Sequence, residues 1–439
     1  MVDENENKPG RNILDREVKH FCSRSCPSSP WIRTRPDPPR WTGQRWRSRG
    51  NLTAERKRKS FHGIVFFIYL PSFLNVKWLI ALQSMEILRY QHVLHLLQRF
   101  GDLNPKILGT ITGERGAPDS VERLRKFHGL ELFPLESHEA LGLSMHCVFA
   151  LSKPSLSLMR IYNVLGSFAY SIYRDVLDSE RLLIFLQWPK GDLNFIKVLE
   201  RMREKGWIYD YDFHAVAKRT FYPQDFSSLD FNSKLLRFEL LEKPKEPFSL
   251  PPLWDGFKPD WFDVNLIGKR QEEPRLNLKQ VANTLGIPYR VALRHWQEHV
   301  VGRGLVSGYN IWFFDVDTRV ILLFERDEEV QEELARIPTL NYLIEMDNQF
   351  VYASIFAQNH FLLDLLKYVS EVSKSTGTKI NVTLSPMKPR FDYTLLSSIP
   401  YEHFSKSGRW EVNVERMVEK VDSLDAKPLQ QSVSLTSKV

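Results

Sequence analysis

Apolar residues recur with a helical period in three segments of the second half of the chain, residues 261–268, 278–285 and 289–301. Gly286 and Pro288 separate the second segment from the third, since neither residue continues a helix. Two helices joined by a tight turn of this kind predict a helix-turn-helix. Residues 304–309 then predict a turn and the start of a strand, as in a wing.

A second pattern follows, in which segments of strand and helix type alternate in the order βαββαβ. The predicted elements are residues 320–324, 328–336, 340–346, 350–357, 360–373 and 379–384. The same order occurs earlier, over residues 145–151, 155–165, 170–177, 181–188, 193–205 and 207–217. It is the order of the ferredoxin-like split βαβ motif. Asp178 and Asp347, which separate the two middle strands of each copy, are interpreted as hairpin-turn residues.

Short matches at a constant spacing indicate an internal duplication. Leu103, Asn104, Lys106 and Gly113 recur 173 positions later as Leu276, Asn277, Lys279 and Gly286. We therefore predict an α+β fold of two tandem units, each a winged helix-turn-helix followed by a ferredoxin-like βαββαβ module. The expected parts are 1–84 (disordered extension), 85–143 (first winged helix), 144–240 (first module), 241–259 (proline-rich linker), 260–312 (second winged helix), 313–393 (second module) and 394–439 (tail). From Lys406 onward we expect a mostly flexible chain.

Positive charge is concentrated at the N-terminal end. The chain has 439 residues and a formal net charge of +7, and its first sixty residues carry 15 Lys or Arg against 7 Asp or Glu. These residues have no helical or strand period, so we interpret them as a disordered basic extension. An alternative hypothesis is that translation starts at Met85, where the regular pattern begins.

One apolar stretch, Ile64–Leu82, is about as long as a membrane span and follows the basic run at 56–59. Pro71, Asn75 and Lys77 interrupt it, so a membrane anchor is the lesser alternative.

Motifs of common catalytic sites are absent. The three cysteines, Cys22, Cys26 and Cys147, are too few for a disulfide framework and too scattered for a four-ligand zinc site, which favours a reducing, cytoplasmic setting. No Walker-type phosphate loop, dinucleotide fingerprint, zinc-protease motif or nucleophile elbow occurs. Histidines fall on predicted helices at His92, His95, His295, His299 and His360, where a packed or exposed ring is more common than a ligand. We expect no catalytic residues, no cofactor and no metal.

The run from Asn277 to Gly286, the third helix and the segment Gly304-Leu305-Val306-Ser307-Gly308-Tyr309 together resemble the Lrp/AsnC family of bacterial and archaeal transcriptional regulators. The last segment is similar to the family's Gly-Val-Ile-x-Gly-Tyr. The resemblance covers residues 260–385 well and 86–220 loosely. It implies a regulator that binds double-stranded DNA, responds to a small effector and oligomerises through its modules, which in one chain could pair with each other. The chain departs from the family at Pro288, usually Ser or Thr, and at His295, commonly a basic residue.

Seven polar side chains are the candidates for DNA contacts, because the later helix of a helix-turn-helix enters the major groove. They are Tyr289, Arg290, Arg294 and Gln297 in the second unit and Arg123, Arg125 and Lys126 in the first. Arginine can pair with guanine and glutamine with adenine. Residues 260–312 hold seven Lys or Arg against five Asp or Glu, so any attraction to DNA must be local.

Two other functions are alternatives. Winged helices that no longer read bases would make the protein an interaction scaffold. Siroheme decarboxylases resemble the same two-part architecture and carry a His-Cys-Tyr run and a basic residue near the central hairpin of the second module. Residues 343–349 here contain neither, and His146-Cys147 lies in the first copy instead.

Overall fold

The computed structural model describes residues 90–101, 117–248, 257–312, 316–387 and 392–425. The possible start at Met85, the apolar stretch Ile64–Leu82 and the pair Cys22 and Cys26 lie outside these residues. No helix among the described residues combines the length and the apolar character that a membrane span requires.

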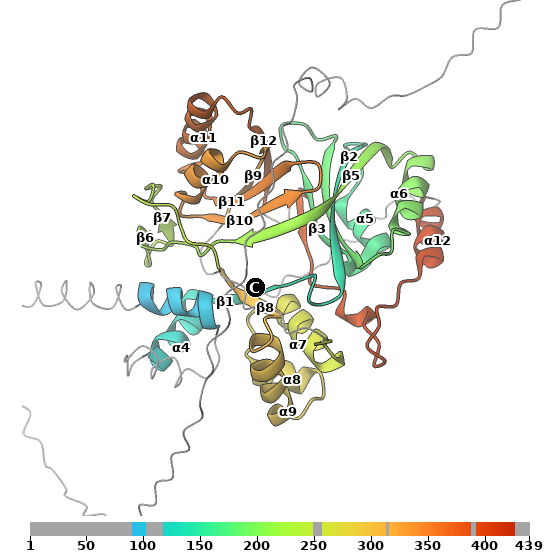
Figure 1. Ribbon diagram of the computed structural model, residues 1–439, viewed down its shortest axis with the longest axis horizontal. Coiled ribbons are helices and arrows are strands. Elements are labelled where there is room, and N and C mark those ends of the chain that lie inside the picture. Colours follow the sequence, from blue (N-terminus) through green and yellow to red (C-terminus); the bar gives the residue numbers. More distant parts are fainter. Residues whose placement is uncertain (1–89, 102–116, 249–256, 313–315, 388–391, 426–439) are drawn as a thin grey trace, which may run out of the picture. The chain divides into compact units, whose positions relative to one another are not determined.

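A nine-stranded antiparallel sheet is the main element of the described fold (Figure 1), which is therefore of the α+β class, as expected. Its strand order is β12-β9-β11-β10-β5-β2-β4-β3-β13. The strands are β2 (Leu143–Ser152), β3 (Ala169–Arg174), β4 (Arg181–Pro189), β5 (Ile208–Phe221), β9 (Thr318–Glu325), β10 (Leu340–Met346), β11 (Phe350–Ala357), β12 (Asn381–Pro386) and β13 (Thr394–Leu396).

Helices interrupt the strands in the order βαββαβ, and this order occurs twice. The helices are α5 (Leu158–Leu165) and α6 (Phe195–Glu204) in the first copy and α10 (Glu328–Ala335) and α11 (Leu362–Thr376) in the second. Asp178 and Asp347 lie in the turns after β3 and β10, which confirms their interpretation as turn residues.

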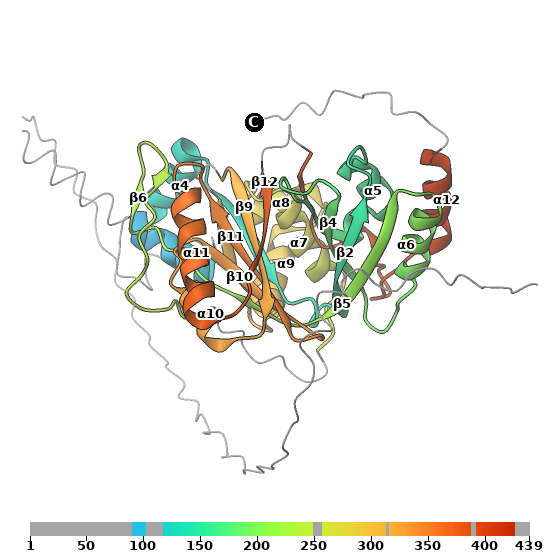
Figure 2. The same cartoon turned by 90° about the horizontal axis from the view of Figure 1, so that it is seen from above.

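Each copy covers one face of its strands with its own helices (Figure 2). Helices α5 and α6 share a core with β2–β5 that includes Leu158, Ile184 and Val198, and α10 and α11 share another with β9–β12. Alternation along each strand places every second side chain on this face and the others on the opposite face. We call the strands of the two copies the first and the second half-sheet.

Strand β5 joins the two half-sheets because it is long enough to serve both. Its first part pairs with β2, from Ile208 to Ala215, and its last part pairs with β10, from Val216 to Phe221. At the far edges, the amide of Val176 donates to the carbonyl of Leu384 at 2.8 Å, which ties the end of β3 to β12. The uncovered faces of the half-sheets therefore pack against each other around a third core.

Three helices precede the second half-sheet: α7 (Trp261–Glu272), α8 (Leu278–Thr284) and α9 (Tyr289–Arg294), the last continued by a π-helix over His295–Val301. Asn277 and Gln280 form a capping box at the start of α8. Gly286 has a φ of 67°, which allows the sharp turn into α9.

The segment expected to form a wing, residues 304–309, leads into β8 (Val306–Trp312). This strand pairs with β1 (Glu131–Glu136) from the first half of the chain. It is therefore one strand of a ribbon that links the two halves, rather than part of a local hairpin.

The first half has a helix over residues 90–100 and α4 (Ala117–His128), which pack together through Leu94, Leu97 and Leu124. Residues 102–116, which would hold the earlier helix and most of the turn of the first helix-turn-helix, fall outside the described chain. A small hairpin of β6 (Leu229–Asp230) and β7 (Leu235–Leu236) follows β5.

The described segment after Lys406, residues 407–425, is not mostly flexible, contrary to expectation. It contains α12 (Val414–Asp425), whose Val414, Met417 and Val421 are buried against α5 and α6. Just before it, Tyr401 lies so close to Gly268 of α7 that a Cβ there would come within 2.5 Å of its ring. Apolar residues at helical spacing explain the packing of α12, and they are visible in the sequence once a partner surface is known.

Candidate active site

The interior between the two half-sheets combines apolar side chains with an unusual number of polar ones. Buried apolar residues include Met145, Phe185 and Ile344. The polar side chains that face them come from both half-sheets and include Tyr170, Ser171 and Tyr173 from the first and Arg319, Tyr342, Tyr352 and Ser354 from the second. A buried polar group costs free energy unless it is paired, so this cluster requires an explanation.

Arg319 lies at the centre of this cluster. Its side chain on β9 is 3% exposed, and its Nη1 donates to the hydroxyls of Tyr173 at 2.5 Å and Tyr342 at 3.1 Å. The guanidinium also lies 4.8 Å from the centre of the Phe356 ring. Within the described part of the chain no Asp or Glu forms an ion pair with it, and its Nε has no acceptor. Arg319 is thus a buried cation held by neutral groups.

Tyr173 and Tyr352, which lie beside Arg319, are protonated at neutral pH. Desolvation by burial raises the pKa of Tyr173 and of Tyr352, and the neighbouring Arg319 opposes this only in part. The Tyr352 hydroxyl is buried without a hydrogen-bond partner, and its ring stacks on that of Tyr342 with 5.8 Å between centroids. The cluster therefore offers neutral hydroxyl donors beside a permanent positive charge.

A second buried network lies nearby and is internally paired. Arg219 of β5 donates to Glu136 Oε1 at 2.8 Å, and Gln271 of α7 donates to the other carboxylate oxygen. His138 lies 3.3 Å from Glu136 and forms a 2.9 Å hydrogen bond with Gln187. Burial, and secondarily Arg219, lower the pKa of His138 well below 6.5, so its ring is neutral. This network connects β1, α7, β4 and the last part of β5, and its charges balance.

His146 and Cys147 do not act together, although they are adjacent in the sequence. Successive residues of β2 point to opposite faces, so Cys147 lies in the interior while the His146 ring packs 4.8 Å from Phe195 of α6. Burial raises the pKa of Cys147 well above 9.0 and lowers that of His146. A buried, protonated thiol is a poor nucleophile.

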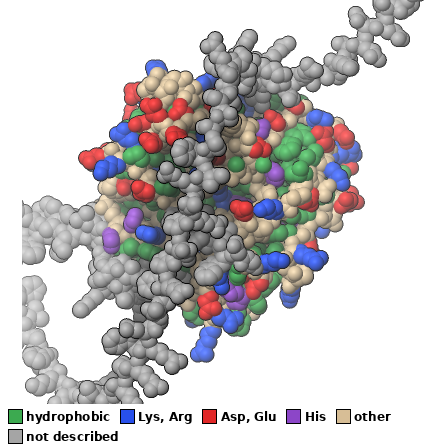
Figure 3. Space-filling view, viewed as in Figure 1, with side chains coloured by type: hydrophobic (Ala, Val, Ile, Leu, Met, Phe, Trp, Pro, Cys, Tyr) green, Lys and Arg blue, Asp and Glu red, His purple; other side chains and the backbone are tan. Residues whose placement is uncertain are grey.

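None of the residues predicted to contact DNA belongs to the interior cluster. Tyr289, Arg290, Arg294 and Gln297 are exposed on α9 and the π-helix. On α4, Arg123 and Lys126 are exposed and Arg125 is half-buried. On the face in Figure 3, Lys and Arg side chains are interspersed with Asp and Glu, without a continuous basic surface.

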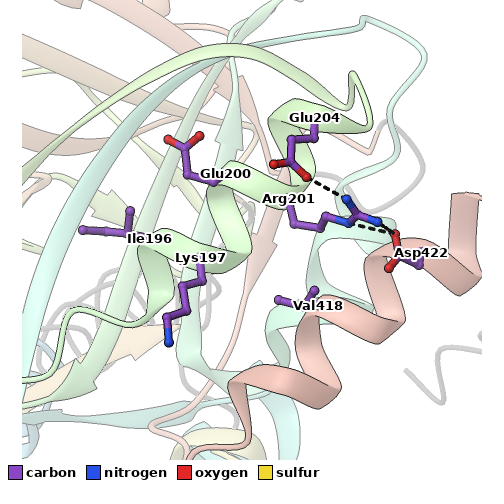
Figure 4. Close-up of a pocket in the computed structure, with 7 residues that line it drawn as sticks. All are labelled: Ile196, Lys197, Glu200, Arg201, Glu204, Val418 and Asp422. Atoms are coloured by element: carbon purple, nitrogen blue, oxygen red, sulfur yellow. Dashed lines mark hydrogen bonds and ion pairs between the residues drawn. The ribbon is translucent and has the colours of Figure 1, made fainter.

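A surface pocket of about 500 Å³ lies between α6 and α12 (Figure 4). Arg201 occupies its wall and is paired with Glu204 at 2.7 Å and with Asp422 at 2.6 Å. Because these charges neutralise one another at an open surface, the pocket has no evident ligand chemistry.

No family model matches the chain, and no curated protein is similar to it. Among solved structures, the siroheme decarboxylase NirDL is similar, with a TM-score of 0.44 and 14% identity, over 76% of this chain and 99% of that one. The same enzyme in co-complex with an iron-uroporphyrin III analogue has a TM-score of 0.42 and 15% identity, over 78% of this chain and 99% of that one.

These comparisons correct the sequence prediction of an Lrp/AsnC-type transcriptional regulator. Both similar structures are enzymes, and the partner in the second is a porphyrin and not DNA, so the predictions of a non-enzyme, of DNA-binding and of a double-stranded DNA partner are wrong. The fold supplies a physical reason. The helix expected to contact DNA, α9, is α-helical over only six residues before it continues as a π-helix. The expected wing is a strand of the ribbon that links the two halves of the chain.

The sequence did not single out the interior cluster. Arg319 precedes the apolar run of β9 and was placed outside the predicted strand, and the tyrosines look like ordinary strand residues. A signal was present, since Arg319 stands two positions before Ile321 and Tyr342 two positions before Ile344, at alternate positions that face the same side of a strand. These side chains come together only because the two half-sheets pack face to face.

Proposed function

We propose that this protein is a siroheme-decarboxylase-like enzyme, which binds a carboxylate-bearing tetrapyrrole at the interior between its half-sheets and removes a carboxylate as CO2. The observation that carries the proposal is the buried guanidinium of Arg319, which has no carboxylate partner in the described chain. The substrate class follows from the iron-uroporphyrin III analogue that is bound in one of the two similar structures.

A buried cation without a counter-charge is costly, and it is commonly retained where a ligand supplies the charge. A guanidinium presents parallel N–H donors that match the two oxygens of a carboxylate. Nη1 of Arg319 donates to two tyrosine hydroxyls, and Nε has no acceptor. A substrate carboxylate would take these donors and replace a tyrosine contact.

The tyrosine hydroxyls beside Arg319 can supply the proton that the second step of a decarboxylation requires. When the bond between the carboxylate carbon and its neighbour breaks, CO2 leaves and the electron pair stays on the neighbouring carbon, which must then gain a proton. Tyr352 and Tyr173 are protonated and lie beside Arg319. Either can deliver that proton and recover one from solvent, while the positive charge stabilises the tyrosinate formed.

The arrangement of the parts belongs to the same proposal. Each half-sheet has the strand order expected of a ferredoxin-like module, with the fourth strand beside the first, then the third and the second. We infer two such modules, at 144–240 and 313–393, each preceded by a helix-turn-helix region at 85–143 and 260–312. We also infer a cytoplasmic location.

Binding of an iron-uroporphyrin III analogue to the full chain tests the proposal, with the Soret band as the readout. We expect a saturable shift, and Arg319→Met should weaken affinity by about tenfold or more, since a hydrogen bond to a charged group contributes roughly 1.5–3 kcal/mol. Methionine keeps the volume and removes the charge, so the fold should survive. Arg290→Ala, which removes an exposed arginine, is the matched control and should bind as the wild type does.

Loss of CO2 is followed by mass spectrometry of the tetrapyrrole product. Tyr352→Phe should retain binding and slow product formation. The proposal fails if the wild-type chain produces no Soret shift, or if Arg319→Met binds as tightly as Arg290→Ala.

A further inference from the structure

Two histidines and two aspartates converge at the junction of α7 and the π-helix, outside the interior cluster. They are Asp260, Asp263, His295 and His299. Each can offer one ligand atom, and these four atoms all lie within 4.8 Å of one another. Asp263 and His295 are buried, with exposures of 0% and 5%, whereas His299 is 29% and Asp260 48% exposed. The cluster is therefore anchored in the core and open on one side.

The spacing between the ligand atoms matches that of a coordination shell. Nδ1 of His295 lies 2.9 Å from Asp263 Oδ1 and 3.5 Å from Asp260 Oδ1, and Nδ1 of His299 lies 3.1 Å from Asp263 Oδ1. Zinc bonds to imidazole nitrogen and carboxylate oxygen of about 2.0–2.1 Å place adjacent ligands of a tetrahedron roughly 3.3 Å apart. Small rotations of the side chains would suffice to receive an ion.

The local structure fixes the directions of these side chains. The two aspartates form a capping box at the start of α7, in which Asp260 accepts from the Asp263 amide and Asp263 accepts from the Asp260 amide. The histidines stand four residues apart in the π-helix, with their ring centroids 4.6 Å apart. A π-helical turn often marks a functional site, because it re-aims side chains that an α-helix would direct elsewhere.

Aromatic rings flank both histidines of the cluster. The ring of Phe257 lies 5.3 Å from that of His299, and the ring of Phe262 lies 5.0 Å from that of His295. Both histidines direct Nδ1 at the same carboxylate oxygen, so two imidazoles share one acceptor. Two imidazole nitrogens beside one carboxylate oxygen form the arrangement expected of ligands grouped around a cation.

We propose that Asp260, Asp263, His295 and His299 bind one divalent transition-metal ion, with Zn²⁺ the best match to two imidazoles and two carboxylates. The ion would join the start of α7 to the π-helix and so fix the helix that follows the turn at Gly286. This site is independent of the proposed decarboxylase function, and it revises the expectation of no metal. The sequence pattern does not reveal this site, because its two aspartates and its two histidines are some thirty residues apart.

Calorimetric titration of Zn²⁺ into the full chain, after treatment with a chelator, tests the site. We expect one ion per chain, and visible absorption of Co²⁺ bound at the same site should report tetrahedral nitrogen and oxygen ligands. His299→Ala should lower the affinity by at least about tenfold. His92→Ala and His95→Ala remove exposed histidines from the helix at 90–100 and should leave the affinity unchanged.

Circular dichroism of each metal-free variant separates a lost ligand from a lost fold. Should His299→Ala fail to fold, Asp260→Asn gives the same test, because asparagine retains the helix cap and weakens the ligand. The proposal is overturned if the wild-type chain binds no Zn²⁺, or if His299→Ala and Asp260→Asn bind it as tightly as the His92→Ala control.

Discussion

Removing one member of the buried ion pair between Glu136 and Arg219 should destabilise the fold far more than removing both. The atoms are 2.8 Å apart, and the side chains are 0% and 10% exposed. At an effective dielectric constant of about 20, the attraction is about 6 kcal/mol. Desolvation of the two charges offsets most of it, so the pair contributes little net stability.

The loss of one partner leaves the other charge buried and desolvated, which costs about 3–5 kcal/mol. Glu136→Gln and Arg219→Met should each lower the free energy of unfolding by that amount. The double variant should lose much less than the sum, with a coupling of about 3 kcal/mol. Urea unfolding of the four proteins measures this, provided that the slope with denaturant stays constant.

The exposed pair of Lys190 and Glu139, 3.3 Å apart, is the matched control and should show no measurable coupling. If the single variants unfold at the wild-type midpoint, or if their effects simply add in the double variant, then the charges are solvated in the native protein and the reasoning is wrong.

Three further predictions concern single residues. Because burial and Arg219 hold the pKa of His138 well below 6.5, the unfolded chain binds more protons below that pH, so the free energy of unfolding should fall as the pH drops below about 6.5. His138→Gln should flatten that part of the profile, and an unchanged slope would assign the pH dependence to another group. Asn277→Ala removes the cap of α8 and should cost about 1 kcal/mol in urea unfolding, whereas Asn283→Ala, on the exposed side of the same helix, should cost little. Val421→Ala should cost about 2 kcal/mol because this side chain of α12 is fully buried against α5 and α6, and a loss no larger than that of the exposed Glu419→Ala would mean that α12 is not packed.

Local elements were predictable because their signals are local. The period of apolar residues placed β10 and β11 at the limits that the structure shows, and Gly286 with Pro288 placed the turn between α8 and α9. The limits of α9 were less accurate, because nothing in residues 295–301 distinguishes a π-helix from an α-helix.

The sequence by itself determined the order βαββαβ, its repetition and the three helices before its second occurrence, since periodicity and turn residues act over a few neighbours. Only the tertiary structure decided the rest. It placed Arg319 of β9 against Tyr173 of β3, residues 146 positions apart, and His295 of the π-helix against Asp263 of α7, 32 positions apart. The packing of α12 and the pairing of β8 with β1 also depend on distant partners. How deeply a side chain is buried, and which groups it contacts, depend on the folded chain. These two properties determine what an arginine on a strand or a histidine on a helix can bind.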